Sequence, residues 1–147
     1  MKYSGISVST MNLASSFVML AARLIVGIVL AAHGWQKFTE WTIAGTTTAF
    51  EGMDVPAPGI AAPVAAIIEL VGGILLIIGL LTRWVAGLVA VDMIGAWAIA
   101  HAGNGIFVDG GGWELVGMIL AAALMLIAAG PGMHSADQFI AKARARA

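Results

Sequence analysis

The sequence contains no cysteine, and this absence limits the chemistry that the chain can perform by itself. Without thiols, disulfides, thiolate nucleophiles, cysteine-ligated zinc and iron–sulfur clusters are all excluded. Charge is also scarce, at 10% of residues against roughly 25% in soluble domains. The net charge of −1 does not provide the basic surface that nucleic-acid binding requires. Any redox chemistry would therefore depend on a bound group, and nucleic acid is not an expected partner.

Apolar residues are abundant where charged residues are few. They make up 61% of the chain, and the mean hydropathy is +0.98. At about 20 residues per crossing, the length suffices for four membrane spans in one domain, predicted at 13–36, 60–81, 84–102 and 113–130. None of these stretches alternates as barrel strands do. The predicted fold class is an all-α, polytopic four-transmembrane-helix bundle.

The loops and basic residues predict how the bundle is connected and oriented. The short connection 81–84 predicts an antiparallel hairpin with an extensive contact, and 41–53 has the spacing of a short interfacial helix. Most basic residues fall on one side: Lys2, Arg83, Lys142, Arg144 and Arg146. The positive-inside rule then makes both termini cytoplasmic. The predicted parts are a cytoplasmic segment 1–12, a four-helix domain 13–132 and a basic cytoplasmic tail 133–147.

Three ionisable residues lie inside the predicted spans. Counted from the start of each span, Arg23, Glu69 and Asp92 are about 15, 13 and 12 Å deep, near the midplane. Each costs at least ~2.5 kcal/mol in hydrocarbon, so each needs a partner or a cavity. We expect Arg23 to pair with Glu69, and either Glu69 or Asp92 to be protonated near neutral pH. The pair has two open interpretations, one structural and one functional.

Helical spacing assigns these charges to inward faces rich in glycine and alanine, which let helices approach closely. The predicted faces are Arg23, Gly27, Leu30, Gly34 and Lys37 on the first span, Ala62, Ala66, Glu69, Gly73, Leu76 and Leu80 on the second, and Leu88, Asp92, Ala96, Ile99 and Gly103 on the third.

A second polar layer is predicted toward the outer side: His33, Lys37, His101, Asn104 and Glu114. His101 falls on the face opposite Asp92 unless the helix unwinds locally near its end. Glu114 begins the fourth span, where a carboxylate also favours the helix dipole without any catalytic role. The histidine spacing matches neither H-x-x-x-H nor H-E-x-x-H. No metal, haem or flavin is expected.

Several short motifs together resemble the DoxX family of membrane proteins. They are Arg23 with Gly27, His33 to Phe38, Pro56 to Pro58, Ile68 to Gly73, Leu80 to Arg83, His101 to Phe107, and Gly130 to Gly132. Ile106 departs from the phenylalanine common in the family. The resemblance implies a four-helix protein of the bacterial inner membrane, described as an oxidoreductase and linked to quinone and to thiol or oxidative stress. The motif positions it carries over are Arg23, His33, Lys37, Glu69, His101 and Asn104.

The leading hypothesis is an oxidoreductase subunit that binds a quinone and works with soluble redox partner proteins. The candidate catalytic residues are Arg23, Glu69, His33 and Lys37, and the candidate cofactor-binding residues are His101, Asn104, Asp92 and Glu114. Lysine and histidine would donate to the quinone carbonyls, and Glu69 with Arg23 would relay protons.

Two alternatives stay open. One is a non-catalytic membrane scaffold for soluble stress-defence proteins, and the other is a small proton-coupled carrier. Four spans are few for a carrier unless it forms a homo-oligomer. Membrane lipid is a partner under every hypothesis.

Overall fold

The computed structural model describes residues 8–146, and side chains from residue 13 onward. Within this range all regular structure is helical, as predicted. The α-helices are α1 (Val8–Thr39), α2 (Thr42–Gly52), α3 (Pro58–Ile78), α4 (Thr82–Ala96), α5 (Glu114–Ala129) and α6 (Ala136–Arg144), with a π-helix η1 (Trp97–His101) and a 3₁₀ turn η2 (Val108–Gly110). Lys2 and most of the predicted segment 1–12 lie outside the described residues.

Three of the described helical stretches are long and apolar enough to cross a membrane: Leu13–Thr39, Pro58–Ile78 and Thr82–His101. The fourth predicted span corresponds to α5, which has 16 residues and is therefore about 24 Å long. It begins and ends within one residue of the predicted span, and Gly130, at φ 81°, ends the helix. These helices define a multi-pass membrane protein.

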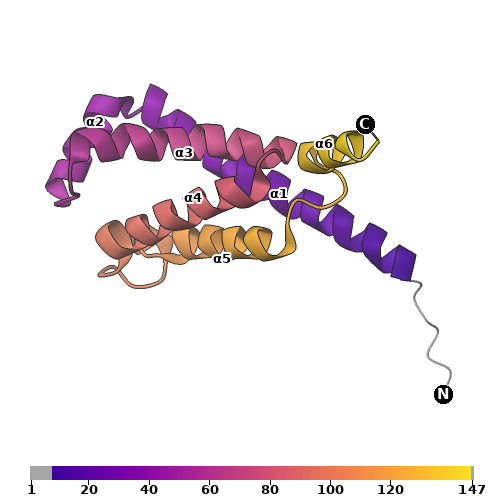
Figure 1. The fold of residues 1–147 in the computed structure, drawn as a ribbon. Coiled ribbons are helices and arrows are strands. Elements are labelled where there is room, and N and C mark those ends of the chain that lie inside the picture. Colours follow the sequence, from indigo (N-terminus) through magenta and orange to yellow (C-terminus); the bar gives the residue numbers. More distant parts are fainter. Residues whose placement is uncertain (1–7, 147) are drawn as a thin grey trace, which may run out of the picture.

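The bundle is built from two helix pairs. Figure 1 shows α1 crossing along α3, and α4 running beside α5, with α2 folded over the start of α3. The contact between α3 and α4 is less extensive than either pair, so the expectation of an extensive hairpin contact is wrong. Gly79 and Leu81 both have left-handed backbone conformations in the connection, and from this turn the two helices diverge (Figure 1).

Glycine fixes the register of α1 against α3. A Cβ atom on Gly27 would lie 2.7 Å from the Gly73 carbonyl oxygen, and one on Gly73 would lie 2.5 Å from the Ala31 nitrogen. Because no side chain fits at these positions, the two backbones pack directly. In this register Lys37 faces Glu69, whereas Arg23 lies against Gly79, at the far end of α3.

The predicted inward faces of the first two spans are confirmed. Their residues are buried, except that Leu80 is half-buried. The face predicted for the third span is wrong: Leu88 and Ile99 are 56% and 42% exposed. The core of α4 instead contains Val85, Val89 and Met93, which pack in one cluster with α5. The stripe containing Asp92 therefore lies at the edge of this contact.

The two ends of the bundle carry different elements. The start of α1, the α3–α4 turn and α6 lie at one end, whereas α2 and the loop before α5 lie at the other (Figure 1). The predicted tail 133–147 contains a docked helix, because Ser135 caps α6 and the Asp137 carboxylate accepts from the backbone of Leu81 and Thr82. Assignment of this end to the cytoplasm stays a prediction.

Candidate functional site

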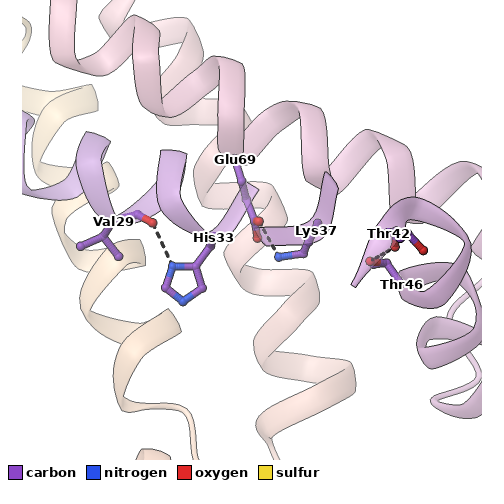
Figure 2. A network of polar contacts seen from close by, with 6 residues as sticks. All are labelled: Val29, His33, Lys37, Thr42, Thr46 and Glu69. Carbon is purple, nitrogen blue, oxygen red and sulfur yellow. Dashed lines mark hydrogen bonds and ion pairs between the residues drawn. The ribbon is translucent and has the colours of Figure 1, made fainter. Parts of the chain in front are cut away.

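A buried ion pair joins α1 to α3. The Lys37 Nζ atom lies 2.5 Å from Glu69 Oε2, and the two residues are 8% and 7% exposed. Figure 2 shows the two side chains pointing toward each other. Glu69 lies near the middle of Pro58–Ile78, a membrane-spanning stretch. The pair is therefore a charged group at membrane depth, where ions are tolerated only with partners.

The turn between α1 and α2 helps to enclose the lysine. The Lys37 ammonium lies 5.6 Å from the centroid of the Trp41 ring, within the range of a cation–π contact. The predicted short helix is present as α2, which packs on α3, and its interfacial position stays a prediction. The buried hydroxyl of Thr46, on α2, donates to the Thr42 carbonyl (Figure 2). This hydroxyl is therefore already paired within α2.

Asp92 adds a second carboxylate from α4. Glu69 and Lys37 are the charged groups that act on it electrostatically. Its Oδ2 atom is buried and makes no hydrogen bond within the described structure. A charged layer therefore exists at the level of Glu69, but its cation is Lys37 and not the expected Arg23.

The expected Arg23–Glu69 pair is not formed. Arg23 is 1% exposed, and its guanidinium donates to the carbonyl oxygens of Pro131 and, at 2.7 Å, His134. Its neighbour Gly79 is ten residues beyond Glu69 on the α3 side, about 15 Å along a helix. The predicted pairing is wrong because α1 is shifted along α3 and runs past its end, so residues at equal depths from the start of their spans do not meet. Arg23 belongs to a separate cluster that holds the segment before α6.

His33 presents an acceptor to its surroundings. Its Nδ1 atom lies 2.9 Å from the Val29 carbonyl oxygen. A carbonyl can only accept, so Nδ1 carries the proton, and Nε2 of the neutral ring accepts. Figure 2 shows the ring turned away from Lys37 and Glu69. In this tautomer the free ring nitrogen, Nε2, is an acceptor, whereas the sequence hypothesis used His33 as a donor.

His101, Asn104 and Glu114 organise the loop before α5. The His101 Nδ1 atom lies 2.7 Å from the Gly111 carbonyl, to which Asn104 also donates at 3.4 Å, and Glu114 accepts from the Val108 backbone at 2.8 Å. The local unwinding considered for His101 is present as the π-helix η1. In the part of the chain that is described, no polar contact connects these three residues to Lys37 or Glu69, so the predicted second layer is divided.

The sequence reasoning missed the polar cluster around Arg23. Ser16 accepts from the Met133 backbone at 2.7 Å, and Asp137 accepts from Leu81 and Thr82 at 2.7 and 2.9 Å. No local signal identified Asp137, because Thr82 is itself a capping residue type and Asp137 lies 55 residues away in the sequence.

Helical spans with a buried Lys–Glu pair define a multi-pass membrane protein with a polar interior. Comparison with known families specifies it further, because residues 18–102 match the DoxX family model. The chain belongs to the DoxX family. No solved structure matches it.

Several bacterial proteins are similar to more than half of the chain. An uncharacterised membrane protein of Mycobacterium tuberculosis is 31% identical over 84% of this chain and 82% of the relative. Inner membrane protein YqjF of Escherichia coli is 30% identical over 84% of this chain and 92% of the relative. A Bacillus subtilis protein named "Putative oxidoreductase CatD" is 40% identical, over 58% of this chain and 61% of that protein.

Proposed function

We propose that this chain is the membrane subunit of an inner-membrane oxidoreductase and that it binds a quinone beside Lys37, Glu69 and Asp92. The observation that carries the proposal is the buried Asp92 oxygen without a hydrogen-bond partner, next to a buried ion pair. Buried polar atoms normally have partners, and ionisable groups at membrane depth are most often functional. The oxidoreductase name of one relative agrees with this function.

The residues fit both redox forms of a quinone. A quinone carbonyl needs a donor, and the Lys37 ammonium has N–H groups beyond the one that contacts Glu69. A quinol hydroxyl needs an acceptor, and Asp92 Oδ2 and His33 Nε2 are acceptors. A bound quinone would supply the two-electron chemistry that the chain lacks.

The same side chains can hold the protons that quinone reduction consumes. Glu69 is buried beside Lys37, whereas Asp92 and His33 are half-buried. Asp92 and His33 are therefore better placed than Glu69 to exchange protons. We assign Asp92 and His33 to proton exchange and the Lys37–Glu69 pair to orientation of the headgroup. The electrons would come from a soluble redox partner.

The proposal is tested by quinone content. The protein is purified in mild detergent, extracted with organic solvent and analysed for quinone per chain. We expect near-stoichiometric quinone in the wild type and at least a tenfold loss in Glu69→Gln, Lys37→Ala and Asp92→Asn. Asp92→Asn leaves the Lys37–Glu69 ion pair intact, so a loss of quinone in this variant cannot be attributed to a broken ion pair. Glu51→Gln and Lys142→Ala repeat two of these changes at exposed positions and should retain quinone.

The absence of quinone from folded wild-type protein would contradict the proposal and favour the scaffold function. Accumulation of a substrate driven by a pH gradient in proteoliposomes would instead support the carrier.

A further inference from the structure

A groove lies between α4 and α5 on the outer surface of the bundle. It has a volume of about 460 Å³ and is lined by Arg83, Trp84, Gly87, Leu88, Val91 and Ile127. Trp84 and Val91 are 79% and 70% exposed, so the groove opens toward the surroundings of the bundle. From Arg83 to Val91 it follows α4 for about 12 Å. Its walls are apolar, and a single charge stands at one end.

That charge is held in place by the end of α5. Arg83 is exposed, and its Nη2 atom donates to the Ala128 carbonyl at 3.4 Å. A Cβ atom on Gly130 would lie 3.2 Å from the same nitrogen, so the glycine makes room for the guanidinium. The other N–H groups of Arg83 are available to an anion beside the α3–α4 turn.

Gly87 keeps the middle of the groove open. A Cβ atom there would meet no protein atom within 4 Å. The glycines between α1 and α3 are packed against a neighbouring helix, whereas Gly87 has no part of the described chain packed against it. Leu88, Val91 and Ile127 provide apolar surface around this space.

We infer that this groove binds an anionic phospholipid, with its phosphate on Arg83 and an acyl chain along the apolar walls over Gly87. Arginine binds phosphate with strong, directional hydrogen bonds, and Trp84 at the end of a span is placed as an interfacial anchor. The occupant must be both anionic and apolar, and a phospholipid carries both parts at the right depth.

A second copy of the chain fits the groove less well. Among the described residues, α6 at this end of the bundle contributes the carboxylate of Asp137 (Figure 1). Both of its oxygens already accept from the backbone of Leu81 and Thr82. A neighbouring copy would therefore leave Arg83 without an anionic partner.

The first test fills the groove. Detergent-solubilised protein is titrated with phosphatidylglycerol, and bound lipid is counted by native mass spectrometry. We expect Gly87→Leu to weaken binding at least tenfold. Gly95→Leu is the matched control, because Gly95 is also on α4, has no atom within 4 Å of a built Cβ and lies outside the groove. Equal binding by both variants would overturn the inference.

The second test removes the charge. We expect Arg83→Gln to lower affinity for phosphatidylglycerol about tenfold and to abolish its preference over phosphatidylcholine. Arg144→Gln makes the same change on α6 and should retain both. Equal effects of the two variants would indicate general surface charge and overturn a specific site. A change of oligomeric state in Gly87→Leu, with lipid binding intact, would identify a second copy as the occupant. Quinone content should not change in any of these variants, which separates this inference from the proposed function.

Discussion

Lys37 and Glu69 form a buried pair in which each charge depends on the other. Both side chains are almost completely buried, so each neutralises a charge that would otherwise face an apolar interior. Breaking such a pair leaves an uncompensated charge, whereas replacing both members by apolar residues of similar size is often neutral. The pair is thus weak evidence for stability in itself, but each member requires the other.

This asymmetry can be measured. Lys37→Met and Glu69→Leu as single changes should each lower the free energy of unfolding by about 3–5 kcal/mol, and the double variant should lose less than either. Unfolding by a denaturing detergent, followed by circular dichroism, gives the values. Additive losses in the double variant would show that the two charges do not compensate each other.

At the scale of helices, contacts between backbones and caps determine the arrangement. The α1–α3 register depends on glycines at the points of closest approach. The start of α4 depends on Asp137, which is 55 residues away from Thr82 in the sequence. Neither interaction can be recognised from the sequence of one helix alone, because each involves a residue of another element.

The glycine contact predicts a cost for one methyl group. Gly73→Ala would place a Cβ atom 2.5 Å from the Ala31 nitrogen, so one helix must shift, and we expect a loss of about 1–3 kcal/mol. Gly95→Ala adds the same group in open space and should be neutral or slightly stabilising, since alanine favours the helix. Thermal unfolding of the two variants should separate them, and equal midpoints would argue against the register.

The cap makes a second prediction for this scale. Asp137→Ala leaves the N–H groups of Leu81 and Thr82 unpaired, and should cost about 1–2 kcal/mol. It should also raise amide hydrogen exchange at the start of α4 and in α6. Asp109→Ala, at an exposed position, is the control. Unchanged exchange at α4 in the Asp137 variant would rule out the cap.

At the scale of the whole molecule, α1 is displaced along the bundle and reaches beyond α3 (Figure 1). The displacement separates two polar clusters, one around Lys37 and one around Arg23. The start of α1, the α3–α4 turn and α6 all lie at one end of the bundle (Figure 1).

The cysteine-free sequence makes this topology testable. Single cysteines in Asp109→Cys and Ala145→Cys lie at opposite ends of the described chain, and a membrane-impermeant maleimide should label them from opposite sides of the membrane. With the cytoplasmic assignment, Asp109→Cys reacts from outside in intact cells and Ala145→Cys only after lysis. Labelling of both from one side would contradict the fold, whereas reversed labelling would contradict the orientation alone.

The amino-acid sequence by itself determined the helical class, the helix α2 and the buried faces of α1 and α3. These follow from local periodicity and from the cost of placing polar groups in lipid, which act on each segment separately. Only the tertiary structure decided which cation meets Glu69, where Arg23 lies and which stripe of α4 is buried. Those outcomes depend on the relative shift and rotation of whole helices, which the glycine contacts of α1 with α3 and the packing of α4 on α5 determine.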